Sequence, residues 1–399
     1  MLSVGLLFGG ESAEHEVSIV SARSIAQNLD SGAFRVIPIG IARNGVWVVL
    51  GDPFARLAAG ELPKKGDCAF LPLEAGAEKT SAPDVIFNVI HGSGGEDGQI
   101  QGYLEILKIP YTGAGRLCNA LAMDKWMTKR VWESEGLPVT PYKAISEEDW
   151  KPNPKGFIDE CLTLGLPVFV KPANSGSSIG IEKIKRADDL KAAIDKAFHY
   201  DRRVLVERGL DAREIEVAVL GTLAEPYLQL GTLAEPYPQL GTLAMPYPQL
   251  GTLACPQIGG YSPIVSMPGE VLVAGEFYDF ADKYLDGKSR TRIPADLPDE
   301  MAQAIRKMAL QAFSGIDGYG LARVDFFVER ITNNIYLNEI NTIPGFTSIS
   351  MFPKLMEAAG VPYKDQLAML IRLALERHRQ MADKQLGFKS GSEWYKGRS

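Results

Sequence analysis

The sequence has few cysteines, no long apolar run and no excess of positive charge, and each absence excludes a class of protein. Its four cysteines are far apart, without a CxxC pair or zinc-finger spacing, so we expect free thiols in a reducing compartment. No apolar run approaches membrane-spanning length, and MLSVGLLFGGESAEHE lacks the basic region and longer apolar stretch of a signal peptide. A net charge of −7 gives no general attraction to nucleic acid or anionic membranes. We therefore expect a cytoplasmic protein that binds neither nucleic acid nor membrane.

Length and composition are those of an ordinary globular protein with several domains. With 399 residues, 46% of them hydrophobic and 23% charged, the chain can form two or three packed domains. The first apolar run, SVGLLF, predicts a strand that ends at Gly9 and Gly10. Apolar residues then recur at helical spacing: Ile19, Ala22, Ala26 and Leu29. Further strand-like runs alternate with helices, so we predict an open α/β domain over residues 1–113.

Two further units are predicted, which makes the fold class mixed, α/β with α+β, in three domains. The central unit, 114–207, contains the strand PVFVKP, a glycine-serine loop, an amphipathic helix and the strand RVLVE. The C-terminal unit, 208–380, opens with the alternating strand REIEVAVLG and later contains a helix with apolar residues at core-facing spacing. Residues 381–399 are polar and lack periodicity, so we expect a frayed tail.

The most informative segments are GLARVDFFV and NIYLNEIN, both read as strands. The first places Arg323 and Asp325 on the face opposite its apolar residues, and the second places Glu339 and Asn341 on one face. If the strands are neighbours, these side chains converge, and oxygen ligands without His or Cys suit Mg²⁺. The alternative is a solvated strand face with scattered charges.

Lysines near a glycine-rich segment are candidates for binding phosphate. In KPANSGSSIG, backbone N–H groups can surround phosphate oxygens, and Lys171 adds a point charge at the end of a strand. The segment is not a Walker A loop, because GK[ST] is absent and a strand follows it; an ordinary hairpin loop fits equally well. Lys125 in AMDKWMTK is a second candidate, with a solvated lysine as the alternative.

Two loops of the first domain follow strands, where open α/β sheets bind ligands. Glu14 in GGESAEHEVS could hold an ammonium group, and His91 in HGSGGEDG could meet a carboxylate or assist proton movement; a structural histidine fits equally well. In the last unit, FYDFADKYLDGKSRT is rich in aromatic and charged residues. Such a segment suits a lid that closes over a substrate and excludes water, or else an ordinary surface loop.

Taken in series, six motifs resemble the D-alanine–D-alanine ligases of the ATP-grasp superfamily. They are FGGESAEHEVS, HGSGGEDGQIQG, AMDKWMTK, FVKPANSGSSIG, LARVDFF and NEINTIPGFTSIS, and the match covers the chain from Val4 to His378 except for one repeat. The resemblance implies a three-domain ATP-grasp fold, with ATP between the central and C-terminal units. It implies a cytoplasmic enzyme, often a homodimer, that uses ATP and two Mg²⁺ ions, with Mn²⁺ as the alternative metal.

In the reaction that the resemblance implies, ATP phosphorylates one D-alanine to an acyl phosphate and the amine of a second D-alanine attacks it. The product is the peptidoglycan precursor D-alanyl-D-alanine. Glu14 would hold the first ammonium group and join Ser177 and Tyr284 in a hydrogen-bonded set that closes the lid. Arg323 and the backbone N–H of Gly345 would stabilise the oxyanion.

The resemblance implies binding roles for the remaining candidates. They are His91 for the first substrate carboxylate, Ser350 for the second, Lys125 and Lys171 for ATP phosphates, Lys283 for the γ-phosphate, Glu207 and Leu210 for adenine, Glu214 for ribose, and Asp325, Glu339 and Asn341 for Mg²⁺.

The lid motif bears on the second substrate. Relatives that make the ester D-alanyl-D-lactate tend to have a histidine where this chain has Lys283 and Tyr284. A cationic lid residue could repel the ammonium group of a second D-alanine, so DKYLDG favours the dipeptide product. D-alanyl-D-lactate synthesis, another ATP-grasp carboxylate–amine ligation, and a compromised ligase that serves as a scaffold are the alternatives.

A ten-residue unit is repeated in LGTLAEPYLQLGTLAEPYPQLGTLAMPYPQLGTLACPQ. The repeat forms an insertion at 222–267, where the ligases that this chain resembles have a short turn between strands. Glycine and proline in each copy interrupt any long strand, so we expect a surface excursion of turns and short extended pieces. The insertion is either a module that presents Pro-Tyr pairs to a partner or a tandem duplication tolerated at a hairpin tip. We favour the duplication.

Overall fold

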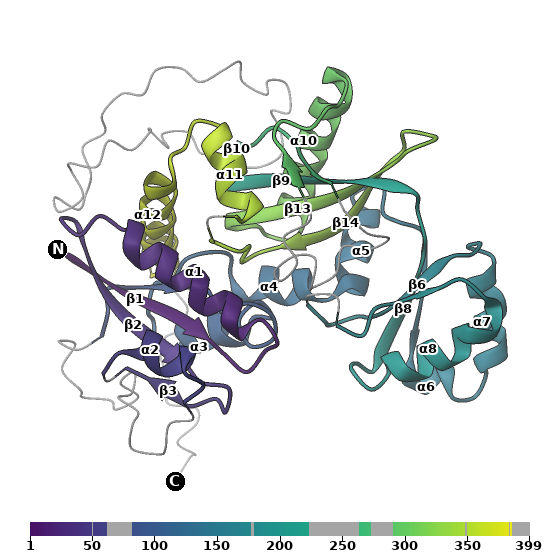
Figure 1. Cartoon of the computed structure of the whole chain (residues 1–399), viewed down its shortest axis with the longest axis horizontal. Helices are drawn as coiled ribbons and strands as arrows, with labels where there is room; N and C mark the ends of the chain where they lie inside the picture. Colours follow the sequence, from purple (N-terminus) through teal and green to yellow (C-terminus); the bar gives the residue numbers. More distant parts are fainter. Residues whose placement is uncertain are drawn as a thin grey trace, which may run out of the picture.

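The computed structural model describes residues 1–49, 51–61, 82–176, 179–222, 263–272, 290–347, 349–382 and 384. Within these ranges the strands form three sheets, one in each of the predicted units, and helices pack against all three (Figure 1). The mixed α/β and α+β fold class is therefore confirmed. No helix in the described part of the chain is long and apolar enough to cross a membrane.

The N-terminal sheet is built around one fully buried parallel strand. Its strands, in the order β3-β2-β1-β4, are β1 (Leu2–Gly9), β2 (Phe34–Ile41), β3 (Trp47–Val48) and β4 (Val85–Asn88). Every residue of β1 is buried, as expected for a parallel strand covered on both faces. Gly9 ends β1 with φ of 91°, and a Cβ there would collide with the Ile41 carbonyl oxygen. Glycine is thus required where the chain turns toward the predicted ligand loop.

Helices cover this sheet and connect it to the next unit. They are α1 (His15–Asn28), α2 (Pro53–Ala58) and α3 (Gln99–Ile106). The predicted apolar face of the first helix is confirmed, since Ile19 and Ala22 are buried against the sheet. The α1 helix follows β1 closely enough that Ser18 accepts a hydrogen bond from Gly9 N at 2.9 Å. The segment GGESAEHE is thereby fixed at the carboxyl edge of the sheet.

The central sheet is antiparallel, with its strands in the order β5-β8-β6-β7. Its elements are β5 (Tyr142–Ser146), α6 (Glu147–Trp150), α7 (Pro154–Leu162), β6 (Val168–Pro172), β7 (Glu182–Ile184), the 3-10 turn η1 (Ala187–Asp189), α8 (Leu190–Ala197) and β8 (Arg203–Arg208). The helices cover one face, and the core beneath them draws all of its buried residues from within this unit. Figure 1 shows it as a separate lobe at the right.

The C-terminal sheet has the order β12-β11-β9-β13-β14, and β10 also pairs with β9. Its elements are β9 (Ala212–Thr222), β10 (Ile264–Val265), β11 (Gly269–Leu272), β12 (Arg290–Arg292), α10 (Asp299–Gly315), β13 (Tyr319–Glu329) and β14 (Ile335–Asn341). The central strands β9 and β13 run antiparallel over their whole length. The strands predicted from REIEVAVLG, GLARVDFFV and NIYLNEIN are all present.

Two helices that precede the central sheet pack against the C-terminal sheet instead. They are α4 (Arg116–Met123) and α5 (Lys125–Ser134). Trp132 of α5 is fully buried and donates from Nε1 to the Ala312 carbonyl oxygen of α10 at 3.1 Å. The sequence-predicted central unit, 114–207, is thus divided in its packing between two sheets.

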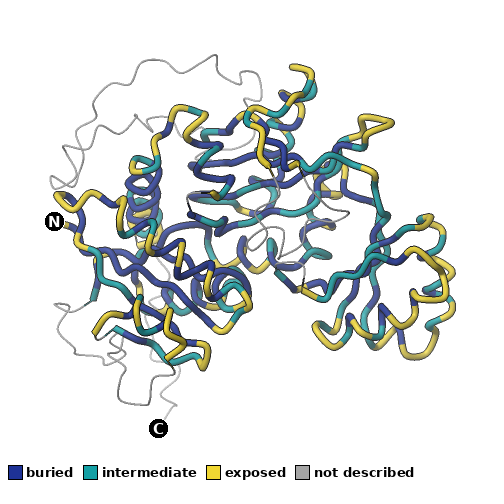
Figure 2. The backbone as a smooth tube through the Cα atoms, viewed as in Figure 1, coloured by how far each residue is buried: buried dark blue, intermediate teal, exposed yellow. Residues whose placement is uncertain are grey.

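The last two helices complete the core of the N-terminal sheet. They are α11 (Met351–Ala358) and α12 (Tyr363–Ala382). One apolar cluster joins Val4 and Leu6 of β1 to Leu355 and Leu370 of these helices, and Figure 2 shows the continuous buried region. Arg377 of α12 also donates hydrogen bonds to the carbonyl oxygens of Tyr111 and Gly113. The first strand and the last described helices therefore share one folded body.

Most of the predicted insertion and tail lies outside the described residues. The structure follows β9 to Thr222 and resumes at Pro263, and β10 returns alongside β9 with Leu220 paired to Ile264. The flanks of the repeat are thus adjacent antiparallel strands. Of the predicted tail, residues 381 and 382 belong to α12, and Lys384 is also described.

Candidate active site

The acidic residues predicted to converge do share one face of the C-terminal sheet. β13 and β14 pair with Arg323 opposite Asn341 and Asp325 opposite Glu339. Asn341 donates from Nδ2 to Asp325 Oδ2 at 3.0 Å. The opposite face of β13 is apolar and buried, as predicted. The solvated-face alternative is excluded for Asp325, which is 8% exposed.

Arg323 is held by two carboxylates on that face. It donates to both oxygens of Asp325, at 2.8 and 2.7 Å, and lies 3.2 Å from Glu216 of β9. Burial opposes its charge, but the attraction of Asp325 and Glu216 outweighs burial and raises the pKa of the guanidinium well above its ordinary value. Arg323 is therefore a cation that stays protonated and is held in one orientation among the acidic residues of this strand face.

The same face has the donor chemistry for a hard divalent cation. Asp325, Glu339 and Asn341 offer carboxylate and amide oxygens, which Mg²⁺ prefers. Asn341 uses its amide nitrogen toward Asp325, which leaves its oxygen end for other partners. Within the described ranges, no group of three or more His, Cys, Asp and Glu side chains forms a metal cluster. Two carboxylates with one amide suit an ion that takes its remaining ligands from water and substrate phosphates.

A cluster of lysines meets one buried glutamate between the central sheet and α5. Glu207 of β8 is 2% exposed and accepts a hydrogen bond from Lys171 Nζ at 2.6 Å, and Lys129 Nζ lies 3.1 Å from its other oxygen. Burial alone would raise the pKa of Glu207, but the two lysines outweigh it and lower that pKa to about 2. Two predicted ATP residues, Lys171 and Glu207, are thus in direct contact.

Lys125 is the third lysine of this region. It lies one turn before Lys129 on α5, and its ammonium donates to the Ser175 carbonyl oxygen in the glycine-serine loop. Burial lowers the pKa of Lys125, Lys171 lowers it further, and Glu339 acts in the opposite direction. The charges of Glu339 and Lys125 are therefore near enough to interact, which makes the lysine cluster and the acidic strand face candidates for one site.

The glycine-serine loop also approaches the N-terminal domain. A Cβ on Gly176 would lie 3.1 Å from the Glu14 carboxylate, and one on Gly92 would lie 2.9 Å from it. Glu14 therefore projects between the loop after β6 and the loop after β4. The loop after β6 joins the antiparallel strands β6 and β7, so the hairpin interpretation of KPANSGSSIG is confirmed, whereas its phosphate role remains a prediction.

His91 connects the N-terminal domain to the segment after β14. Its Nδ1 lies 2.9 Å from the Ile343 carbonyl oxygen and its Nε2 lies 3.3 Å from Ser21 Oγ. Burial lowers the pKa of His91, although Glu14 and the Ile343 carbonyl act against that shift. The imidazole is therefore neutral near pH 7. The structural role considered for His91 is present, and a role toward substrate remains a prediction.

Gly345 and Ser350 are brought together at the start of α11. Ser350 Oγ accepts from Thr347 N at 3.0 Å, and a Cβ on Gly345 would lie 2.8 Å from that same oxygen. The predicted oxyanion donor and the predicted second-substrate residue thus come from one short loop. This loop begins directly after Ile343, which contacts His91.

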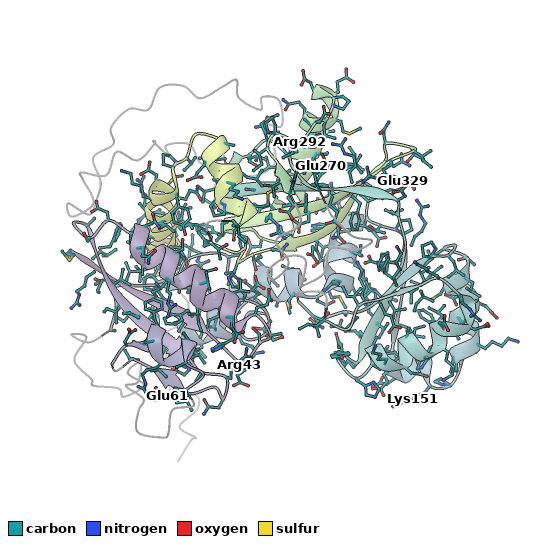
Figure 3. All side chains as sticks on the ribbon, in the orientation of Figure 1. Arg43, Glu61, Lys151, Glu270, Arg292 and Glu329 are labelled. Atoms are coloured by element: carbon teal, nitrogen blue, oxygen red, sulfur yellow. The ribbon has the colours of Figure 1, made fainter. Side chains whose placement is uncertain are left out.

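Polar contacts join the central unit to the C-terminal unit, and we call this boundary the polar seam: it includes Glu207 with Lys129 and Lys171, and Arg208 with Glu329. Arg208, at the end of β8, donates to Glu329 at 3.0 Å, and Figure 3 labels Glu329 where β13 approaches the central lobe. Leu210 lies in the short connection after β8 and is half-buried. Glu214 pairs with Phe327 two residues from Glu216 on β9, on the same face as Asp325. Ser177, Lys283 and Tyr284 lie outside the described residues.

Comparison with known proteins identifies the family. The family model described as D-ala D-ala ligase N-terminus matches residues 3–114, and the model described as D-ala D-ala ligase C-terminus matches residues 131–236 and 250–372. The chain belongs to the D-alanine–D-alanine ligase family. Its described architecture is the ATP-grasp fold of that family.

Individual members of the D-alanine–D-alanine ligase family match along nearly the whole chain. The ligases of Thermoanaerobacter sp. (strain X514) and Solibacter usitatus are 40% and 41% identical, over 94% and 95% of this chain and 97% of each relative. The solved D-alanine-D-alanine ligase of Coxiella burnetii is 31% identical with a TM-score of 0.73, covering 96% of this chain and 97% of that one. VanG D-Ala:D-Ser ligase from Enterococcus faecalis is 27% identical with a TM-score of 0.69, covering 94% and 99%.

Three residues of this ligase-family site were missed by the sequence analysis. Glu216 follows Glu214 by two positions, so strand alternation could have placed it on the same face. Lys129 follows Lys125 by four, which is the spacing of one helix face. Glu96 accepts from Gly92 N at 2.8 Å, and burial and then the negative charge of Glu14 raise the pKa of its carboxyl well above its ordinary value. Only the fold could reveal that Glu96 lies near Glu14, because the two residues belong to different loops.

Proposed function

We propose that this chain joins two D-alanine molecules into D-alanyl-D-alanine at the expense of ATP, for peptidoglycan precursor synthesis. The observation that carries the proposal is the aimed Arg323, held between Asp325 and Glu216 on the same sheet face as Glu339 and Asn341. In a member of the D-alanine–D-alanine ligase family, this places a fixed positive charge beside oxygen ligands where a phosphoryl group would be transferred.

The residues around Arg323 account for the two chemical steps. Glu14 holds the ammonium group of the first D-alanine. The carboxylate of that same D-alanine takes the γ-phosphoryl group of ATP. ADP leaves in that step. The amine of the second D-alanine then attacks the acyl carbon and loses a proton, and inorganic phosphate leaves from the tetrahedral intermediate, whose oxyanion Arg323 and the backbone N–H of Gly345 stabilise. His91 would lie beside the first carboxylate without adding charge, because its pKa is lowered by burial and its single N–H, on Nδ1, faces the Ile343 carbonyl oxygen. Ser350 orients the second substrate, whose amine must approach the same carbonyl carbon.

ATP would lie between the central and C-terminal sheets, where polar contacts replace an apolar core. Lys125 and Lys171 would contact its phosphates, Glu207 and Leu210 its adenine, and Glu214 its ribose. Lys283 would reach the γ-phosphate, and Tyr284 and Ser177 would close the lid with Glu14. Asp325, Glu339 and Asn341 would hold two Mg²⁺ ions, or Mn²⁺ in their place, whose charge neutralises the phosphate oxygens.

The decisive experiment measures phosphate release by the intact chain. Release should require both D-alanine and Mg²⁺, and Glu339→Gln should lower kcat by about a hundredfold or more because it removes a metal-binding charge. Glu300→Gln, a change of the same kind on the exposed first turn of α10, should leave kcat unchanged. Absence of D-alanine-dependent release from the wild-type chain would refute the proposal.

The second substrate and the repeat define the alternatives. A panel of D-alanine, D-serine and D-lactate as acceptors tests the dipeptide product, and an ester or a D-serine product as the main one would correct it. Excising residues 222–261 tests the scaffold alternative: unchanged turnover with no lost partner excludes it. We also propose a homodimer, which sedimentation of the purified chain tests.

A further inference from the structure

Lys129 is among the most deeply buried charged residues of the described chain. Its side chain is 1% exposed, on the inner face of α5, and its ammonium lies 3.1 Å from Glu207 Oε1. It also lies 5.6 Å above the ring of Tyr142 on β5, which is a cation–π distance. Burying an ammonium group this deeply costs free energy, because water no longer solvates the charge, and only a charged or hydrogen-bonding partner can offset that cost.

The partner of Lys129 is shared with a second lysine. Lys171 donates to the other oxygen of Glu207 at 2.6 Å, so one carboxylate separates two ammonium groups. Lys171 makes the shorter of the two contacts, and Lys129 contacts the other oxygen at 3.1 Å. Glu207 is therefore bound by both lysines, most closely by Lys171.

Nucleotide binding would take one of its two lysine partners away from Glu207. A phosphate group arriving at the end of β6 attracts Lys171, which is the residue nearer the glycine-serine loop and, at 10% side-chain exposure, the more accessible of the two lysines. Glu207 would then be a buried carboxylate with one partner lost, and such a group either takes up a proton or turns away. A second lysine that stays beside the carboxylate opposes both changes.

We propose that Lys129 is a positioning residue for the nucleotide: it keeps Glu207 ionised and aimed at the adenine amino group while Lys171 moves to a phosphate. This inference rests on the proposed function, because it takes the nucleotide to be ATP and Glu207 to face adenine. It predicts that Lys129 controls the preference for adenine over a base without the 6-amino group, even though Lys129 itself does not touch the base.

The test compares the binding of ADP and inosine diphosphate by calorimetry, with no turnover required. Inosine has a carbonyl oxygen where adenine has the amino group, so an ionised Glu207 rejects it. Lys129→Met should reduce the preference for ADP by about tenfold or more, because Glu207 can then protonate or turn away. Lys129→Arg should retain most of the preference, and Arg130→Met, an exposed neighbour on the same helix, all of it.

A double-mutant cycle separates positioning from a general structural role. If Lys129 acts through Glu207, then Lys129→Met adds no further loss of preference in a Glu207→Gln background. The double variant removes Lys129 together with the carboxylate and leaves Lys171 as the one buried charge of the cluster, so it can be compared with Glu207→Gln if Lys129→Met alone does not fold. An unchanged preference in Lys129→Met, or a further loss in the double variant, would overturn the proposal.

The binding test and the ligase test fail independently. An ADP preference that depends on Lys129 in a chain without D-alanine-dependent turnover would support the inference and refute the ligation. Turnover in a chain whose base preference ignores Lys129 would do the opposite.

Discussion

The N-terminal and central sheets are both four-stranded, yet they are attached to the rest of the molecule in different ways. The N-terminal sheet shares an apolar core with α11 and α12, in which Phe346 stands between Phe87 of β4 and Phe352 of α11. The central sheet closes its core with its own helices and meets its neighbours through polar contacts such as Arg208 with Glu329.

This difference shows which boundary can move. A shared apolar core loses buried area as soon as its halves separate, whereas ion pairs and hydrogen bonds can exchange partners with substrate or water at little net cost. The central sheet therefore suits a unit that shifts against a fixed body when a nucleotide enters between them. The N-terminal sheet and the C-terminal sheet form that fixed body.

The largest expected effect is a loss of turnover from a substitution in the C-terminal sheet, which contacts both the N-terminal and the central units. Arg323→Met should lower kcat by about a hundredfold to a thousandfold, because it removes the charge aimed at the oxyanion. Steady-state turnover of D-alanine and ATP measures it. Arg330→Met, an exposed arginine just beyond β13, is the matched control. Turnover within tenfold of the wild type would show that Arg323 only supports the sheet.

The next effect tests the two kinds of core. Phe346→Ala should destabilise the fixed body by about 3–5 kcal/mol, because it leaves a cavity between the N-terminal sheet and the C-terminal helices. Ile194→Ala, in the core of the central sheet, should cost about 2–5 kcal/mol but act on the central unit alone.

Hydrogen exchange resolves these two effects by region. We expect faster exchange in both β1 and α12 for Phe346→Ala, and in β6 and β8 only for Ile194→Ala. If either substitution accelerates exchange throughout the chain, the two regions unfold as one unit and the comparison does not hold.

Acid should weaken the polar seam. The pKa of Glu207 is lowered from 4.5 to about 2, so its ionised form stabilises the fold above pH 4.5 and that contribution is lost as the pH falls toward 2. The stability advantage of the wild type over Glu207→Gln should therefore shrink steadily from pH 5 to pH 3. Urea unfolding monitored at several pH values measures it. A constant difference would mean that the ionised carboxylate contributes nothing.

The smallest expected effect is at the β9–β10 hairpin. Replacing residues 223–262 with an Asn-Gly turn should raise stability by only about 1–2 kcal/mol, because loop closure depends weakly on length. Turnover should stay within about twofold, since Leu220 and Ile264 keep their pairing. A large loss of turnover would show that the repeat supports the neighbouring sheet or lid.

Much of this architecture was predictable from the sequence because the signals are local. Alternation in GLARVDFFV placed Arg323 and Asp325 on one face, and the structure confirms the neighbouring strand with Glu339 and Asn341. Helix α10 was visible from its apolar spacing. The three-domain ligase fold followed from six motifs in series, each of which is short and ordered along the chain.

What the sequence could not predict are relations between distant segments. Nothing local in AMDKWMTK indicates that α5 packs on the C-terminal sheet through Trp132, or that Lys129 faces a carboxylate from β8. The contact of His91 with Ile343 likewise joins residues far apart in the chain. Such contacts depend on how units dock, and docking is set by complementary surfaces whose pattern one sequence does not show.

The sharing of one core between β1 and α12 also determines when the molecule can fold. β1 is translated before α11 and α12, so this strand has no complete apolar partner until those helices have been made. The central sheet can close its core much earlier. β1 is thus protected from solvent later than the central sheet, although it is translated earlier, and a nascent chain halted before α11 exposes the apolar face of β1 to chaperones and proteases.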